Sequence, residues 1–202
     1  MKTANVVQYK DFPCLDTRRA GYQLPAIEID PAAVKILLIS EAAPENPADY
    51  YYAGINALFA STTLLAFQDA GAKVASMQDI LNQGVYLTTA VKCAKTGPGL
   101  ASATSQNCSF LLEKEIGLFP NVKVFLLMGD VAIKAINAIA RRNNEARVIP
   151  AGSTYKIRGG EFQFQGARAF PSYVQAGPAF FVEKSKRRMI AEDIRKALLI
   201  AN

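Results

Sequence analysis

Three carboxylates and three tyrosines stand close together in the first part of the chain. Glu41, Glu45 and Asp49 lie in a segment punctuated by prolines, and three consecutive tyrosines ending at Tyr52 follow them. A carboxylate can orient a water molecule, and a phenol ring can support a planar ligand. The stretch therefore predicts either a site for a planar ring or an acidic surface loop with tyrosines packed on a sheet. The residues of this stretch alone leave both interpretations open.

The apolar run in front of this stretch indicates how such a site would be positioned. Residues 34–40 form an apolar run without polar alternation, which is typical of a strand buried on both faces. Apolar and β-branched residues predict further strands at 85–91 and 122–128, and a short fourth strand at 168–170. Ligands bind at the carboxyl ends of strands in an open α/β sheet, so the carboxylates would meet the other strand ends there.

Helical spacing of apolar residues predicts the elements between these strands. The predicted helices lie at 55–70, 77–82, about 105–118, 131–141 and about 182–200. Strands that alternate with helices favour right-handed crossovers and a mostly parallel sheet. We therefore expect one α/β domain over residues 1–202, with three α/β/α layers, a central mostly parallel sheet of about four strands, and residues 1–31 packed on it as an N-terminal arm. A Gly-Gly pair within 155–165 also predicts a β-hairpin.

The composition excludes several kinds of site. The 202 residues include 23 basic and 17 acidic side chains, a net charge of +6, and no histidine. This chain therefore cannot supply a Ser-His, Cys-His or His-metal arrangement. The modest positive charge favours a polyanion such as nucleic acid without requiring one. No apolar run is long enough to span a membrane and the first residues do not resemble a signal peptide, which predicts a cytoplasmic protein without membrane association.

Four strand ends carry motifs in a fixed order. These are ISEAAPEN and YYAG at 39–46 and 51–54, VYLTTAVKC at 85–93, a Cys-x-x-x-Leu helix and strand at 108–129, and Phe-Pro-Ser at 170–172. Taken together they resemble the uracil-DNA glycosylase superfamily, most closely its thermophilic-type (family 4) iron–sulfur branch, and the likeness covers roughly residues 12 to 202. The resemblance implies a uracil-DNA glycosylase-like fold and a hydrolase of base-excision DNA repair. Such an enzyme binds an extruded base in damaged or mismatched DNA and cleaves its N-glycosidic bond.

The resemblance also implies roles for individual residues. The carboxylates able to orient water are Glu41, Glu45 and Asp49. The base-binding positions are the stacking platform Tyr52, the backbone N–H groups of Ala42 and Ala43, the base-edge position Thr89 and the closing-loop position Phe170. The DNA-binding positions are the closing loop, with Tyr173 or Val174 as the wedge, and the basic start of the last helix: Pro171, Ser172, Tyr173, Val174, Lys184, Lys186, Arg187 and Arg188.

Two departures from the family pattern bear on catalysis. Thr89 stands where the family has an asparagine, and one hydroxyl cannot read an amide edge with two opposed hydrogen bonds. Phe170 stands where the family has a histidine, and loss of one oxyanion donor costs about two to three orders of magnitude in rate elsewhere. Mismatch-specific branches also work without that histidine. The alternatives are an active DNA N-glycosylase, or a catalytically degenerate member that binds nucleic acid, a nucleobase or a nucleotide without hydrolysis. A small-molecule enzyme on a doubly wound sheet is a third.

The cysteines match the family's cluster site in part. The resemblance places Cys14, Cys93 and Cys108 at three ligand positions and Thr17 at the fourth. Four thiolates are the usual ligand set of an iron–sulfur cluster. We therefore expect a vestigial site with no metal or cofactor, with a bound cluster as the disfavoured alternative. Expected partners are DNA and a nucleobase or nucleotide ligand, and the sequence does not indicate an oligomeric state.

Overall fold

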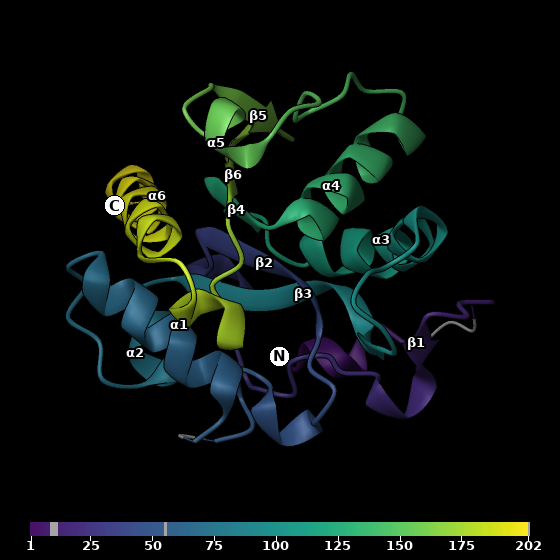
Figure 1. The fold of residues 1–202 in the computed structure, drawn as a ribbon, viewed down its shortest axis with the longest axis horizontal. Helices are drawn as coiled ribbons and strands as arrows, with labels where there is room; N and C mark the ends of the chain where they lie inside the picture. The colour runs from purple at the N-terminus through teal and green to yellow at the C-terminus, as the bar shows by residue number, and fades with distance from the viewer. Residues whose placement is uncertain (9–11, 55, 202) are drawn as a thin grey trace.

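The computed structural model describes residues 1–8, 12–54 and 56–201, and their backbone forms a layered α/β fold (Figure 1). Within this part of the chain the sheet has six strands in the order β1-β3-β2-β4-β6-β5. The four inner strands run parallel: β2 (Ile36–Ala43), β3 (Val85–Lys95), β4 (Val124–Met128) and β6 (Ala167–Ser172). Two short antiparallel strands, β1 (Thr17–Arg18) and β5 (Phe162–Phe164), flank them. The α/β fold with a mostly parallel sheet is confirmed, and the two outer strands are additional to the four expected.

Helices cover both faces of the sheet (Figure 1). One face packs on α1 (Leu58–Asp69), α2 (Met77–Asn82) and α6 (Lys184–Ala201), and the other packs on α3 (Ser102–Ile116) and α4 (Asp130–Arg142). Alternate residues of β2 enter the two cores: Ile36 and Leu38 face the first, and Leu37 and Ile39 face the second. This is why the β2 sequence is apolar without alternation.

Most predicted elements are present with shifted ends. The helix predicted over 77–82 has those bounds, because Ser76 and Asp79 form a capping box at its start. The helix predicted over 55–70 begins at Leu58, and residue 55 lies outside the described residues. β2 begins at Ile36 and continues to Ala43, so the strand includes part of the stretch predicted as a loop.

The β-hairpin predicted at the Gly-Gly pair is wrong. Residues Thr154–Ile157 form the short helix α5, and the hairpin lies further on, between β5 and β6. Its turn consists of Gln165 and Gly166, both with positive φ (50° and 77°), as a tight hairpin turn requires. β6 also continues through Pro171 instead of stopping there. β5 pairs with β6 only up to Ala169. At Pro171, β6 is therefore paired on one side alone, with β4, and such an edge position tolerates proline.

The N-terminal segment runs along the outer edge of β3. β1 pairs with β3 at Ala94 and Lys95, and the N–H of Gln23 donates to the carbonyl of Lys92 at 2.7 Å. The short 3-10 helices of the chain are η1 (Thr3–Asn5), η2 (Arg19–Gly21), η3 (Pro31–Ala33), η4 (Pro47–Asp49) and η5 (Pro178–Phe181). Among the described residues, no helix combines the length and apolar character needed to cross a membrane.

Candidate active site at the strand ends

A cleft of about 370 Å³ opens at the carboxyl ends of β2, β4 and β6. We call it the Glu41 cleft. Its lining is Glu41, Gly129, Asp130, Thr154, Ser172, Tyr173, Val174, Ala179, Phe180, Val182, Glu183, Lys186, Arg187 and Ile190. This is the crevice where parallel α/β sheets hold ligands, and its volume lies within the range of small-molecule sites.

Glu41 is held in the cleft by the start of α4. The side chain is half-buried, and the N–H of Val131 donates to Glu41 Oε1 at 3.4 Å. The N-terminus of a helix attracts negative charge, so this position suits a carboxylate. Gly129, which precedes α4, has φ +103°, and a Cβ there would lie 2.6 Å from both Glu41 Oε1 and Val174 Cγ2. The approach of Glu41 to α4 therefore requires glycine at position 129.

The other two candidate carboxylates lie away from this cleft. Glu45 is exposed and pairs with Arg18 at 3.1 Å. Asp49 accepts a hydrogen bond from the N–H of Leu58 at 3.4 Å, at the start of α1. These contacts give Glu45 a surface ion pair and Asp49 a capping position, so Glu41 is the member of the trio that faces the strand-end cleft.

Tyr51 fills the space between β2, β3 and the segment after β6. Its hydroxyl lies 2.5 Å from Ser40 Oγ and accepts a hydrogen bond from Gln175 Nε2 at 3.0 Å. Thr89 pairs with Ser40 in the sheet and is fully buried. Thr89 Oγ1 and Gln175 Oε1 are buried without a hydrogen-bond partner among the described residues. Burial raises the pKa of Tyr51 well above its usual value, so the phenol stays neutral. Because Thr89 is fully buried and does not line the Glu41 cleft, it is closed off from that cleft.

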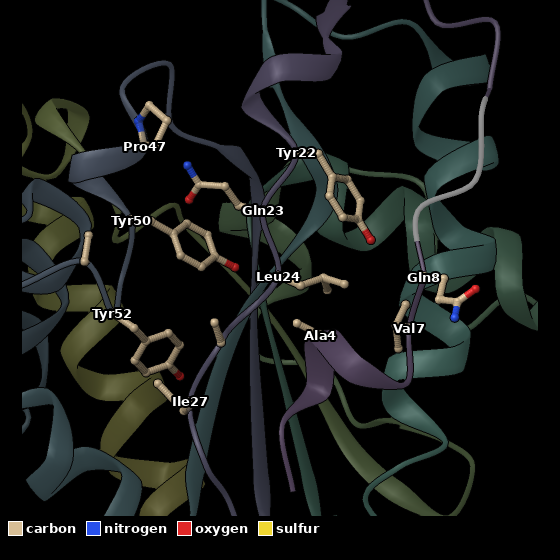
Figure 2. Close-up of a pocket in the computed structure, with 12 residues that line it drawn as sticks. Ala4, Val7, Gln8, Tyr22, Gln23, Leu24, Ile27, Pro47, Tyr50 and Tyr52 are labelled. Carbon is tan, nitrogen blue, oxygen red and sulfur yellow. The ribbon is translucent and has the colours of Figure 1, made fainter.

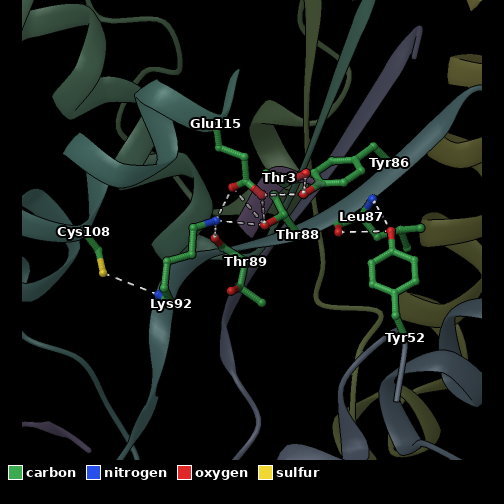
Figure 3. Close-up of polar contacts among 9 residues, drawn as sticks. All are labelled: Thr3, Tyr52, Tyr86, Leu87, Thr88, Thr89, Lys92, Cys108 and Glu115. Carbon is green, nitrogen blue, oxygen red and sulfur yellow. Dashed lines mark hydrogen bonds and ion pairs between the residues drawn. The ribbon is translucent and has the colours of Figure 1, made fainter. Parts of the chain in front are cut away.

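The remaining base-binding candidates are also separated. Phe170 is 4% exposed and packs in the core, with the Arg168 guanidinium 4.9 Å from the centre of its ring. Tyr52 lies at the edge of β3, where its hydroxyl accepts from the Leu87 N–H at 3.0 Å and donates to the Leu87 carbonyl at 3.2 Å (Figure 3). The structure therefore does not bring Tyr52, Phe170 and Glu41 around one pocket, because the tyrosine turn leads away from the cleft.

Ala42 and Ala43 belong to β2 and do not form a free loop. They pair with β3 at Val91 and Ala94, across an irregularity in the register. The extended motif, with its extra residue before Pro44, thus prolongs the strand. Their role as N–H donors to a base oxygen stays a prediction, and it requires the end of this pairing to open.

The closing segment after Phe170 is held in place by a hydrogen bond to α6. Pro171 and Ser172 are buried, and Ser172 Oγ donates to Asp193 Oδ2 at 2.6 Å. Arg158 donates to Asp193 Oδ1 at 2.8 Å, and burial raises the Asp193 pKa despite these bonds. The Ser172 hydroxyl is therefore already bound within the protein and does not face a duplex. Beyond it, Tyr173 and Val174 are half-buried in the wall of the Glu41 cleft.

The basic start of α6 is partly neutralised. Lys186 pairs with Glu183 at 2.6 Å, and Arg187 pairs with Asp69 at 2.5 Å. Two further candidates, Lys184 and Arg188, are exposed, and Arg188 lies 3.9 Å from Glu192. Positive charge available to phosphates is therefore greatest at Lys184 and Arg188.

The order of strands and motifs around this cleft agrees with a comparison against known proteins. The model of the uracil DNA glycosylase superfamily matches residues 27–194, most of the chain. The chain belongs to the uracil-DNA glycosylase superfamily. A type-5 uracil-DNA glycosylase of Thermus thermophilus is 33% identical over 82 residues, which cover 41% of this chain and 37% of that protein. The superfamily resemblance is confirmed. The relative is named a type-5 enzyme, so the finer placement in the thermophilic-type (family 4) branch does not gain support.

This superfamily member contains a buried ionic network that was not predicted (Figure 3). Lys92 and Glu115 are 0% and 1% exposed and form an ion pair. Lys92 Nζ also donates to the Thr89 carbonyl at 2.6 Å and to Thr88 Oγ1 at 2.8 Å, and Tyr86 Oη donates to Glu115 at 2.7 Å. A buried charge is tolerated when it is paired and hydrogen-bonded. The network fixes the backbone of β3 beside Thr89.

The superfamily's cluster site is represented by thiols alone. Cys93 and Cys108 are buried, Cys14 is partly buried, and all three are free. Burial raises the Cys93 pKa to about 11, and the Lys92 N–H donates to Cys108 Sγ at 3.4 Å. Across the described residues, no group of three His, Cys, Asp or Glu side chains is placed to hold a metal ion. The three thiols do not fit a four-thiolate cluster.

An exposed apolar pair next to the cleft was also not predicted. Phe181 and Val182 are 54% and 77% exposed, and Val182 lines the Glu41 cleft. In the sequence, a Phe-Phe-Val run at 180–182 precedes the basic start of the last helix. The same run is equally typical of the first turn of an amphipathic helix, so it does not predict an exposed pair. The structure places Phe181 in η5 and Val182 before α6, outside the apolar stripe of that helix.

Proposed function

We propose that this superfamily member is a DNA-base glycosylase-like hydrolase that binds an extruded base in damaged or mismatched DNA and cleaves its N-glycosidic bond. The observation that supports the proposal is the placement of Glu41, half-buried in the strand-end cleft and held by the N-terminus of α4. The relative in Thermus thermophilus is named a uracil-DNA glycosylase, so uracil is the first base to test.

The chemistry of the reaction suits a carboxylate in this position. As the glycosidic bond breaks, the base leaves with negative charge and the sugar becomes oxocarbenium-like. A fixed carboxylate stabilises the positive sugar and orients water toward its carbon. In this proposal Glu41 performs both tasks, while Glu45 and Asp49 stay outside the reaction.

The DNA would meet the rim of the same cleft. Tyr173 and Val174 line its wall, and Phe181 and Val182 project beside it. Apolar side chains of this kind unstack a base step, and lysines beside them contact phosphates. We assign the wedge to Phe181 and Val182, because Val174 is packed against Gly129. The exposed Lys184 follows them closely in the sequence.

The second candidate is a member that binds nucleic acid or a nucleobase without hydrolysis. The burial of Phe170 and Thr89 favours it, since neither position offers a donor to the leaving base. The two candidates predict the same binding and differ in the product.

Duplexes that contain uracil, hypoxanthine, xanthine or mismatched thymine separate the candidates. We expect abasic product from at least one duplex, and a fall of about a hundredfold or more for Glu41→Gln. Glu45→Gln is the matched control, since its carboxylate lies on the surface. Salt-dependent binding without product, beside an active control enzyme, supports the second candidate. Absence of both binding and product rejects both.

A further inference from the structure

A second cavity formed by described residues lies away from the Glu41 cleft, at the outer edge of β3. Its volume is about 640 Å³, and it shares no lining residue with the cleft. We call it the tyrosine cavity. It is bounded by the start of the chain, by residues 22–27 and by the turn 47–53, which supplies Tyr50 and Tyr52 (Figure 2). Ala42, Ala43, Thr89 and Phe170, the other base-binding candidates, are not part of its lining.

Two polar atoms of residues that line this cavity are buried without a full hydrogen bond to the described residues: the Tyr50 hydroxyl and Gln23 Nε2. Tyr50 is 4% exposed. Its hydroxyl interacts weakly with Thr88, whose own hydroxyl also bonds Glu115 and Lys92. Figure 2 shows the Gln23 amide and the Tyr50 ring on the same side of the arm. Native proteins seldom leave such atoms unsatisfied, so the presence of two of them beside one cavity indicates a place for a ligand.

The lining also defines the charge of that ligand. No acidic or basic side chain occurs among the described residues that line the cavity. Burial raises the pKa of Tyr50 well above its usual value, so its phenol keeps its proton and can donate or accept. A charged ligand would lose its hydration here without gaining a counter-charge. The cavity is therefore suited to a neutral molecule.

The walls are rigid and aromatic. The Tyr52 hydroxyl is fixed by both backbone groups of Leu87, and the backbone of Gln23 is fixed by Lys92. The rings of Tyr50 and Tyr52 have centroids 6.4 Å apart and are inclined by 68°, so they do not cover each other's faces. Pre-organised aromatic walls bind planar rings with little loss of conformational freedom.

We propose that the tyrosine cavity is a second ligand site, for a small uncharged planar ring with hydrogen-bonding groups at its edge, which is the chemistry of a free nucleobase or nucleoside. Gln23 Nε2 donates to a carbonyl of the ring, and the Tyr50 hydroxyl bonds a neighbouring edge group. The site goes beyond the proposed hydrolysis and does not require it, because Glu41 takes no part.

Calorimetric titration of the full chain tests this site with uracil, thymine, hypoxanthine and adenine, their nucleosides and their 5′-monophosphates. We expect saturable binding of at least one base or nucleoside, and binding at least about threefold weaker for its monophosphate, since no cation occurs among the described residues that line the cavity. Tyr50→Phe and Gln23→Leu should each weaken binding by about three- to tenfold, the effect of one hydrogen bond. Tyr155→Phe, an exposed tyrosine outside the cavity, is the matched control.

The outcomes separate this site from the proposed hydrolysis. Glu41→Gln should leave the titration unchanged while it lowers the rate of product formation from DNA by about a hundredfold or more. Thermal melting establishes that each variant is folded, and Tyr50→Phe preserves the shape of the side chain. Absence of saturable binding up to about 10 mM, beyond the millimolar range of weak ligands, overturns the proposal. Equal affinity of the wild type, Tyr50→Phe and Gln23→Leu also overturns it.

Discussion

The end of β2 supplies Glu41 to the Glu41 cleft, and the turn that follows supplies Tyr50 and Tyr52 to the tyrosine cavity, yet the linings of the two differ in chemistry. The cleft contains carboxylates and cations, including Glu41, Asp130 and Lys186, and opens where parallel strands end. The cavity is lined by neutral and aromatic side chains and lies beside the edge of β3. A carboxylate and an aromatic platform that are close in sequence thus serve different places. The two proposals thus assign bond cleavage and ring recognition to different places in this chain.

The largest effect should come from the buried ionic network of Lys92 and Glu115. Lys92→Met leaves Glu115 buried without its counter-charge, which we expect to lower the free energy of unfolding by about 3–5 kcal/mol. Urea denaturation measures this loss. The double variant Lys92→Met/Glu115→Leu removes the unpaired charge and should recover much of the stability. A double variant as unstable as the single one would contradict this account.

Gly129→Ala should damage the Glu41 cleft and spare the tyrosine cavity. The new methyl group meets Glu41 and Val174 at a backbone with φ +103°, so we expect a loss of about 1–3 kcal/mol and a displaced Glu41. Glycosylase activity should fall more than the stability alone explains, and nucleobase affinity should not change. Gly97→Ala is the control, because a Cβ at Gly97 has nothing within 4 Å. Equal loss in both sites would show that they are coupled.

Tyr51→Phe tests the buried tyrosine that stands between Tyr50 and Tyr52 in the sequence and lines neither region. The change removes one hydroxyl that serves Ser40 and Gln175. We expect a loss of about 1–3 kcal/mol because Ser40 loses its buried partner and Gln175 Nε2 keeps only Thr63. Tyr155→Phe, at an exposed tyrosine, should stay within about 0.5 kcal/mol of the wild type. Thermal or urea unfolding distinguishes them, and an unchanged Tyr51→Phe would refute the role of the hydroxyl.

The cysteines predict a dependence of stability on alkaline pH. The Cys93 pKa is raised from 9.0 to about 11, chiefly by burial. Between these values the unfolded chain has lost this proton while the folded chain retains it, so the free energy of unfolding falls as pH rises. Buried tyrosines add to the decline. Cys93→Ala should therefore show a shallower decline than the wild type in urea titrations under reducing conditions. Identical slopes would mean that Cys93 is not protected in solution.

The smallest effect concerns the rim of the Glu41 cleft. If the rim contacts phosphates, Lys184→Met should reduce the slope of log K against log salt for duplex binding by about one. Arg187→Met should change it less, since Arg187 is already paired with Asp69. Fluorescence anisotropy at several salt concentrations measures both slopes. A larger change for Arg187→Met would place the DNA nearer to α1.

Much of the fold follows from patterns that are local in sequence. β2, β3 and β4 are buried on both faces, so their apolar runs mark them, and the capping box marks α2. β1 and β5 have two and three residues, too few for a pattern. The Gly-Gly pair suggested a hairpin because the sequence does not show which glycine adopts a positive φ in a turn.

The candidate site was predictable in position and less so in composition. Strand order places Glu41 and Ser172 at one edge of the sheet, and the structure finds them in one cleft. The sequence does not specify the path of the turn 47–53, and that path directs Tyr51 inward and Tyr52 to the edge of β3. The partnership of Lys92 and Glu115, which are far apart in the chain, likewise depends on the packing of α3 on β3.

The hydrogen bonds from Tyr52 to Leu87 have a consequence for self-association. An open edge strand presents unpaired N–H and C=O groups to which another chain can add. At Leu87 a phenol hydroxyl satisfies both groups, and at Lys92 the backbone of Gln23 takes the carbonyl. The turn that carries the tyrosines thus also protects the outer edge of β3. Changes that release this turn would expose a template for intermolecular strand pairing, so such variants would lose solubility together with their ligand site.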